Sequence, residues 1–369
     1  MGKRITVVGT GNVGCTLAAD LIRKGHSVSL LKTSRTLHED NYARIRTTGI
    51  IEVDDPYIGK YQSNITNFFE LDYQGAVRDA DVIIITTQTN YHESIIKQIS
   101  PFLRDRQVIV FEPGYLSTSF LLKHCDKEIV SIEAESSPID CRITAPGRIK
   151  VFFKNVLNPF GVYPLSKLAV ARSVLESLGY PFRFTENVFE AALHNPNLIV
   201  HTVGALFSIP RIEYSKGEYW MYREVFTPHV WNVCEALDRE KLAVLEGLGI
   251  PSSQRYVEAC QERNYVDDPR DPLDSFFDYA NNSSPKGPSI PDSRYLTEDT
   301  SQGLVMLESL GRYLNVETPV ASSLISLACA SLQIDLRERG RTIEKLGLAY
   351  LDRIKNDYHH ISRPPRPLP

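Results

Sequence analysis

A glycine-rich turn near the N-terminus constrains this chain more than any other feature of its sequence. The motif Gly9-Thr10-Gly11-Asn12-Val13-Gly14 directly follows an apolar run, Arg4 to Val8, and opens a helical stretch, Cys15 to Lys24. Gly9 suits a tight turn, Gly11 lets the backbone approach a pyrophosphate, and Gly14 allows a helix to pack closely on a strand. The unpaired N–H groups and the dipole at the helix start favour an anion. The motif therefore predicts a dinucleotide-binding fold.

Short apolar runs alternate with helical stretches through the first half of the chain. Six runs have the length and composition of strands: Arg4–Val8, Ser27–Leu31, Val82–Thr86, Gln107–Phe111, Glu128–Ile132 and Lys150–Phe153. Strands separated by crossover segments pair in parallel, because a short turn cannot return the chain to the same end of the sheet. The pattern predicts an α/β Rossmann domain, with a doubly wound and mainly parallel sheet, over residues 1–186.

The pattern changes to long amphipathic helices from about Asn187. One predicted helix begins at Thr227, with Pro228 in the first helical position, and ends at Gly249. Two more helices are expected over residues 302–314 and 320–336. The polar stretch over residues 264–291 is predicted to be a long loop. We therefore expect an all-α C-terminal domain over residues 187–369.

Composition and charge exclude several classes of protein. The chain carries 41 Lys and Arg against 45 Asp and Glu, a net charge of −4, so it has no basic field to hold a nucleic acid. Its apolar runs are far shorter than the roughly 18 residues that a membrane span needs. The six cysteines are dispersed without a CxxC pair, which predicts no metal site and favours a reducing cytoplasm.

The predicted second strand ends in Lys32-Thr33-Ser34-Arg35, where an NAD-specific enzyme would place an acidic residue for the ribose hydroxyls. Two cations and two hydroxyls suit a 2′-phosphate, which predicts a preference for NADP, with NAD still possible. A solvated basic turn is the alternative interpretation. Thr87 and Gln88 follow the strand Val82–Thr86, at a carboxyl edge where such folds bind ligands, and we expect them to line the cofactor site.

Three further segments resemble the opine (octopine/nopaline) dehydrogenase family. The segments run in family order and are Glu133–Arg142 with Gly147–Lys150, Asn197–His201 continued by Leu206 and Arg211–Glu213, and Arg294–Asp299 followed by Gly303–Val305. Together with the glycine motif they cover most of the chain, from residue 5 to about residue 335. Collinearity over that length is much more specific than any single motif.

The resemblance implies a reaction and three site residues. Members of the family join the amino group of an amino acid to a 2-keto acid with NADH or NADPH. The residues that match the family's catalytic pair are His201, which exchanges a proton, and Asp299, which orients it. Arg294 matches a residue that holds a substrate carboxylate. Histidine suits this chemistry because its reference pKa, about 6.5, allows proton exchange near neutral pH.

Other interpretations of the same residues stay open. His201 lies in an apolar helical run and by pattern alone would be a core histidine, and Asp299 precedes a predicted helix and could be an N-cap. His194 is the reserve catalytic candidate. A 2-hydroxy-acid or ketopantoate-type reductase shares the two-domain plan, and a non-catalytic NADP-sensing protein is a third possibility. An apolar helical domain would also allow a homodimer.

Overall fold

The computed structural model describes residues 2–251 and 253–362, which form two compact units. Of the described residues, 2–188 and 353–362 form one unit, and the other runs from Phe189 to Asp352. The boundary predicted after residue 186 lies two residues from the one in the structure. The chain from Arg353 groups with the first unit, whereas the sequence had assigned it to the helical half.

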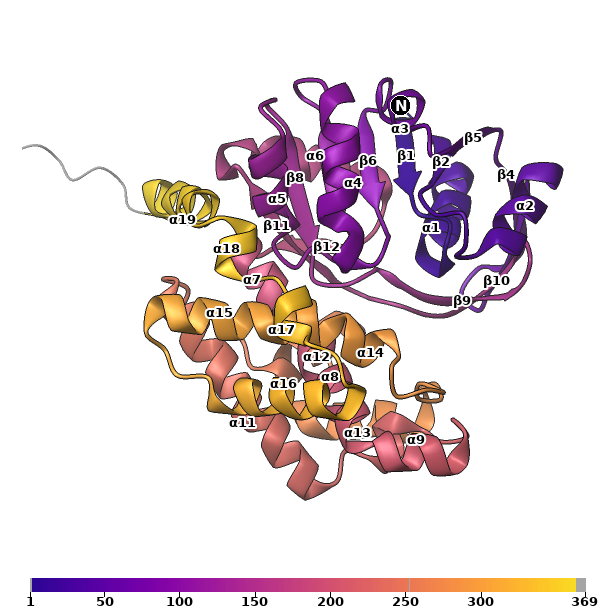
Figure 1. The fold of residues 1–369 in the computed structure, drawn as a ribbon. Helices are drawn as coiled ribbons and strands as arrows, with labels where there is room; N and C mark the ends of the chain where they lie inside the picture. Colours follow the sequence, from indigo (N-terminus) through magenta and orange to yellow (C-terminus); the bar gives the residue numbers. More distant parts are fainter. Residues whose placement is uncertain (1, 252, 363–369) are drawn as a thin grey trace, which may run out of the picture. The chain divides into compact units, whose positions relative to one another are not determined.

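The first unit is built on an eight-stranded sheet (Figure 1). In spatial order its strands are β12 (Phe182–Phe184), β11 (Asn158–Tyr163), β8 (Val130–Ala134), β7 (Val108–Phe111), β6 (Val82–Ile85), β1 (Arg4–Val8), β2 (Ser27–Lys32) and β5 (Asn67–Glu70). Only β11 and β8 pair antiparallel among these neighbours. The structure therefore confirms a mainly parallel Rossmann-type sheet.

A second sheet of four strands belongs to the same unit. Its order is β4 (Gly59–Asn64), β3 (Ile50–Asp55), β10 (Arg148–Lys154) and β9 (Ile139–Ala145). The predicted strand Lys150–Phe153 is part of β10, so its expected place in the parallel sheet was wrong. Buried and exposed residues alternate over the first half of β10, as in a strand with one solvated face. Periodicity identifies such a strand, but it does not identify its partner.

Helices cover both faces of the main sheet. Those of the first unit are α1 (Asn12–Arg23), α2 (Glu39–Thr48), α3 (Tyr73–Val77), α4 (His92–Ile99), α5 (Ser117–His124) and α6 (Leu168–Leu178), with short 3₁₀ turns at η1 (Thr89–Tyr91), η2 (Ser100–Phe102) and η3 (Leu165–Lys167). Helices α1 and α6 share one buried core with alternate strand residues such as Val7, Ile84 and Val110. Alternation along the strands leaves the other face to α3, α4 and α5. This arrangement is the doubly wound plan.

The described residues of the second unit form helices and no strand, as predicted (Figure 1). They are α8 (Asn197–Phe207), α9 (Ile209–Ser215), α10 (Met221–Glu224), α11 (Pro228–Gly247), α12 (Tyr256–Asn264), α13 (Pro272–Asn282), α14 (Arg294–Thr297), η4 (Asp299–Leu304), α15 (Val305–Leu314), α16 (Pro319–Leu332), α17 (Leu336–Arg339) and α18 (Ile343–Leu346). Helices α7 (Val188–Leu193) and α19 (Leu348–Ser362) lie at its ends.

Two sequence predictions for this unit were wrong in detail. The expected loop over residues 264–291 contains α13, which Asp271 caps by accepting a hydrogen bond from the backbone N–H of Leu273. Phe276 on α13 is buried and packs against Trp231, with ring centroids 4.7 Å apart, so an aromatic cluster orders a stretch that its polar composition suggested was a loop. The helix predicted over residues 320–336 ends at Leu332.

Candidate functional site

The glycine motif forms a tight turn between β1 and α1, and at each of its three glycines the structure shows what a side chain would meet or strain. Gly9 has a φ of +113°, a conformation that side chains rarely adopt. A Cβ on Gly14 would lie 2.0 Å from the carbonyl oxygen of Gly9, and one on Gly11 would lie 3.3 Å from Nε2 of His38. The three glycines thus leave this backbone without a Cβ of their own, which suits close approach of a pyrophosphate, and the ring of His38 lies beside Gly11.

Polar contacts from neighbouring elements fix this turn. Asn12 Oδ1 accepts a hydrogen bond of 2.8 Å from the backbone N–H of Ile143 on β9. Asn41 donates through Nδ2 to the carbonyl oxygen of Thr10 at 3.3 Å. Val13 is half-buried and packs against the core beneath α1. The loop is thus held by the second sheet and by α2 before any cofactor arrives.

The four residues at the end of β2 have different environments. Lys32 is 1% exposed; its Nζ donates to the carbonyl oxygen of Leu37 at 2.8 Å and lies 3.2 Å from Oε2 of Glu39. Thr33 is half-buried, and Ser34 Oγ accepts hydrogen bonds from two backbone N–H groups of the following turn. Arg35 is exposed. Lys32 therefore stabilises the turn from within, and Arg35 is the cation that faces solvent.

The carboxyl ends of β6 and β7 bring several polar groups to one edge of the sheet. Thr87 Oγ1 is buried and has no hydrogen-bond partner among the described residues, and Gln88 beside it is half-buried. His92, at the start of α4, lies with Nδ1 2.7 Å from Ser117 Oγ and Nε2 3.1 Å from the carbonyl oxygen of Thr87. Sequence reasoning missed His92, although its position five residues after Thr87 was a usable signal.

Glu112 is a second residue at this edge that the sequence analysis did not single out. It follows β7 directly, its side chain is 3% exposed, and its Oε2 has no hydrogen-bond partner in the described structure. Burial raises the pKa of Glu112 to about 8, because the charged form loses its hydration without gaining a counter-charge. The carboxyl is thus protonated at neutral pH and can donate a hydrogen bond.

In the second unit, the structure brings the predicted catalytic pair together. His201 lies on α8 and is 5% exposed, and Asp299 is the first residue of η4 and is 2% exposed. Nδ1 of His201 is 2.8 Å from Oδ2 of Asp299. A carboxylate accepts only, so Nδ1 of His201 is the donor in this bond and carries a proton. Asp299 follows α14 within a π-helical turn, so it is not an N-cap.

Helix α14 carries two further candidate site residues. The ring of Tyr295 stacks on the imidazole of His201, with centroids 3.6 Å apart and planes at 6°, and so restricts rotation of the imidazole. Arg294 lies on the same short helix; its side chain is 47% exposed, and Nη1 is 3.6 Å from Oε2 of the buried Glu298. Tyr295 was missed by sequence reasoning, although it stands between two predicted site residues.

His194 belongs to a different polar cluster. Its Nδ1 is 3.4 Å from Nζ of Lys241, which is 1% exposed and pairs with Asp238 at 2.6 Å. Asp238 also accepts a hydrogen bond from the backbone N–H of Tyr256. These contacts tie α11 to the start of α12 and to the turn between α7 and α8. They give His194 a structural environment, distinct from the His201–Asp299 pair.

The described residues show no metal cluster and no single membrane-spanning helix. No group of three or more His, Cys, Asp or Glu side chains is arranged to hold a metal ion. No single described helix is long and apolar enough to cross a membrane; one bent pair, Pro319–Leu332 with Leu336–Leu346, meets the criteria of length and composition alone.

Two family models match successive parts of the chain. Residues 184–332 match the model described as "NAD/NADP octopine/nopaline dehydrogenase, alpha-helical domain". Residues 5–149 match the model of the ketopantoate reductase PanE/ApbA family. The first match contains the catalytic pair and the second contains the glycine motif, so each predicted set of site residues falls within one of the two models.

Relatives match along nearly the whole chain. An opine dehydrogenase from Arthrobacter sp. (strain 1C) is 29% identical over 356 residues, covering 95% of this chain and 96% of the relative. The protein ocs of Agrobacterium tumefaciens (strain Ach5) is 26% identical, covering 94% and 95%. Among solved structures, octopine dehydrogenase with NADH and agmatine superimposes with a TM-score of 0.75 at 17% identity, covering 96% and 98%. Yersinopine dehydrogenase with NADP⁺ gives 0.72 at 15% identity, covering 97% and 99%.

Proposed function

Because the chain belongs to the octopine/nopaline dehydrogenase family, we propose that it is an NAD(P)H-dependent opine dehydrogenase, an oxidoreductase acting on CH–NH groups. The amino group of an amino acid adds to the carbonyl of a 2-keto acid, water leaves, and the resulting imine is reduced to a secondary amine. The cofactor supplies the hydride that reduces the imine carbon. Relatives solved with arginine and with pyruvate support an amino acid and a 2-keto acid as the substrate classes.

The His201–Asp299 pair carries this proposal. Each cycle requires a proton to move to or from the reacting nitrogen or oxygen, and Nε2 of His201 is the atom that does this. Asp299 holds the imidazole through Nδ1 at 2.8 Å and stabilises the imidazolium when it forms. Tyr295 prevents the ring from turning away. Burying a histidine costs free energy of hydration that an apolar core residue would not lose. A buried histidine whose tautomer and rotation are both fixed suits acid–base catalysis.

Arg294 is the residue that we assign to a substrate carboxylate. Its side chain is 47% exposed, and Nη1 lies 3.6 Å from Oε2 of Glu298. A partly exposed guanidinium offers a substrate carboxylate two parallel N–H donors. Both substrates carry a carboxylate, and Arg294 lies one residue from the tyrosine that stacks on His201.

The first unit would hold the cofactor. The pyrophosphate would lie against the backbone of the glycine motif at the start of α1, and Thr87 Oγ1 offers an unused hydroxyl at the nicotinamide side of the sheet edge. We propose a preference for NADPH because Thr33, Ser34 and the exposed Arg35 can meet a 2′-phosphate, while the buried Lys32 adds positive potential beneath them. Lys32 acts here through its charge and not by direct contact.

A ketopantoate-type reductase is the second candidate, since residues 5–149 match that family model. Such an enzyme would reduce a keto acid directly, without an amine. The match is confined to the dinucleotide half, whereas the catalytic pair falls within the helical octopine/nopaline model. We therefore favour the opine reaction.

A matrix of 2-keto acids against amino acids tests the proposal. NADPH oxidation is followed by absorbance, and the product is identified by mass. We expect turnover that requires both substrates and yields a secondary amine. Turnover with a keto acid alone, giving a 2-hydroxy acid, would favour the reductase, and cofactor binding without turnover of any pair would favour a sensing protein.

A further inference from the structure

The helix that carries Asp299 begins as a π-helical turn, η4, and continues as α15. In a π-helix each N–H bonds to a carbonyl five residues back, which widens the turn and makes it less stable than an α-helix. Such turns are therefore short and depend on contacts from outside the helix. In this structure every residue of η4 is buried, so those contacts come from side chains and backbone packed against it.

The chain between α17 and α18 supplies these contacts. Arg341 is 1% exposed, and its Nε donates to Oε1 of Gln302 at 2.9 Å. The backbone N–H of Arg341 donates to the carbonyl oxygen of Ser301 at 3.1 Å. Gln302 in turn donates through Nε2 to Ser301 Oγ at 2.9 Å. Consecutive residues in the middle of the π-turn are thus held by one buried arginine.

Close backbone approach makes this contact possible. A Cβ on Gly340 would lie 2.4 Å from Cγ1 of Val305 and 2.7 Å from the carbonyl oxygen of Ser301. Only glycine allows the chain to pass so near η4 without displacing it. The position of Arg341 against Gln302 therefore depends on the residue before it as well as on its own side chain.

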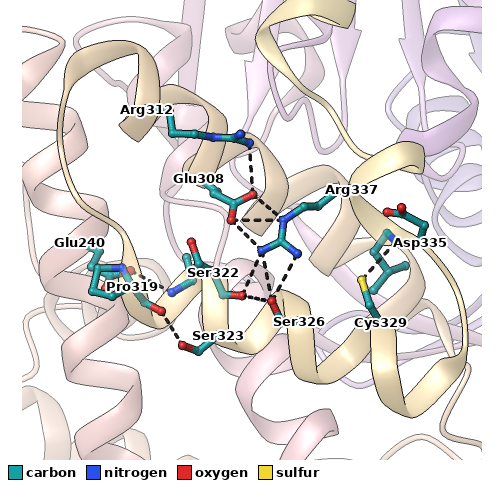
Figure 2. Close-up of polar contacts among 12 residues, drawn as sticks. Glu240, Glu308, Arg312, Pro319, Ser322, Ser323, Ser326, Cys329, Asp335 and Arg337 are labelled. Carbon is teal, nitrogen blue, oxygen red and sulfur yellow. Dashed lines mark hydrogen bonds and ion pairs between the residues drawn. The ribbon is translucent and has the colours of Figure 1, made fainter.

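A second arginine, Arg337, holds α17, the short helix that precedes Gly340 and Arg341 (Figure 2). Arg337 on α17 donates to Glu308 on α15 through Nη2 at 2.7 Å and through Nε at 2.9 Å, and Nη2 also donates to the carbonyl oxygen of Ser322 on α16. The side chain of Asp335 caps α17 by accepting from the N–H of Glu338. Helix α17 is thereby tied to α15 and α16, which sets the direction in which the chain reaches η4.

We propose that Arg341 is a positioning residue for the catalytic pair: through Gln302 it holds η4 in the π-helical register that places Asp299 against His201. Relaxation of the turn to an α-helix would rotate Asp299 about the helix axis and separate it from α8. A buried guanidinium also loses its hydration, a cost that an apolar side chain would not carry. The inference rests on the proposed function, because the pair has a catalytic meaning only in that reaction.

Two variants test the proposal. Arg341→Lys keeps the charge but removes the planar Nε donor, and Gln302→Met keeps the volume but removes the acceptor. Arg339→Lys, at an exposed position two residues from Arg341, is the matched control. Either variant alone is sufficient, so a variant that fails to fold leaves the other to decide.

The first readout is the low-field proton NMR resonance of the His201 Nδ1–H, assigned by its absence in His201→Asn. We expect this resonance to move upfield or broaden in Arg341→Lys and Gln302→Met and to persist in Arg339→Lys. The second readout is kcat, which we expect to fall about 10- to 100-fold through misplacement of the pair, with the Kd for NADPH unchanged. A folded variant with the wild-type resonance and kcat would overturn the proposal. If the wild-type protein turns over no substrate pair, the proposed function fails, whereas the resonance still decides whether Arg341 positions Asp299.

Discussion

Oδ2 of Asp299 lies 2.8 Å from Nδ1 of His201, although the two residues are 98 positions apart in the sequence. One comes from the middle of α8 and the other from a π-helical turn, and both side chains are buried. A carboxylate at this distance orients the imidazole, which is the arrangement that the proposed acid–base role of His201 requires. Two residues that are far apart in the sequence thus form one hydrogen-bonded pair, and substitutions of either residue test what the pair does.

Removing the imidazole should abolish most turnover. We expect His201→Asn to lower kcat by about 10²- to 10⁴-fold, the usual contribution of a general acid–base group. Asp299→Asn should lower kcat as well, because an amide can support the wrong tautomer and cannot stabilise imidazolium. The double variant should be scarcely slower than His201→Asn, since the two residues act as one unit.

The control for this series is His229→Asn, which changes an exposed histidine on α11 and should leave kcat unchanged. Fluorescence titration should give the same Kd for NADPH in all variants, because the glycine motif belongs to the other unit. A His201→Asn protein with near wild-type kcat would contradict the assignment.

Arg294→Ala should act mainly on substrate binding. Loss of one charged hydrogen-bond partner is worth roughly 1.5–3 kcal/mol, so we expect the KM for the keto acid or the amino acid to rise about 10- to 100-fold with a smaller effect on kcat. Arg312→Ala is the matched control, because Arg312 pairs with the buried Glu308 at the same i,i+4 spacing. Equal effects of the two substitutions on KM would show that Arg294 does not meet substrate.

Arg35→Ala tests the cofactor preference. We expect the Kd for NADPH to rise by about one to two powers of ten and the Kd for NADH to change little, because only NADPH carries the 2′-phosphate. Arg46→Ala removes an exposed arginine from α2, where it pairs with Glu70, and should affect neither cofactor. If Arg35→Ala raised the Kd for NADPH and for NADH equally, the guanidinium would contact a part of the cofactor other than the 2′-phosphate.

Glu112 should make the free energy of unfolding depend on pH, over the range between its pKa in the unfolded protein and its raised pKa in the folded protein. The pKa of the buried carboxyl is raised to about 8 in the folded protein, above the value of an exposed glutamate. The folded state therefore holds a proton that the unfolded state releases, and stability is lost as pH rises through this range, by roughly 1.4 kcal/mol per pH unit. Above about pH 8 both states are ionised and the loss ends.

Thermal unfolding of Glu112→Gln measures this effect, since the amide does not titrate. The gain in Tm over the wild-type protein should be small at pH 5, grow as pH approaches 8 and then level off. Glu128→Gln is the control, because Glu128 is exposed and, like Glu112, lies between β7 and β8 in the sequence. This variant should show no such trend. A constant difference across the pH range would mean that Glu112 titrates normally.

Sequence patterns predicted the parts of the structure that local physics controls. The spacing of Gly9, Gly11 and Gly14 predicts the turn, because a side chain at each position would be excluded by residues close to it in the turn or by its backbone conformation. The apolar stripe after Thr227 gives α11 within two residues of its end. The pair His201 and Asp299 was predicted differently, through resemblance to a family, since nothing local to either residue distinguishes it from a core or capping residue.

The features that the sequence missed depend on partners distant in the chain. Lys32 is a charged residue at the end of β2, so its burial could not be predicted without the following turn, whose Leu37 carbonyl accepts its hydrogen bond. The π-helical start of the helix predicted over residues 302–314 has an ordinary amphipathic pattern, and Arg341, 39 residues from Gln302, stabilises it. Helix α13 follows the same rule, because its ordering comes from Trp231 on another helix.

The π-helical turn has a consequence for how this site tolerates insertions and deletions. Each residue of an α-helix advances the chain by about 100° around the axis, and a π-turn is equivalent to an α-helix that has gained one residue. Deleting a single residue from Asp299–Leu304 would restore an uninterrupted α-helix while leaving the apolar face of α15 in place, and the carboxylate would then point away from His201. We expect such a deletion to remove the chemistry of the helical unit while keeping its fold, so the length of this turn matters for activity together with the identity of Asp299.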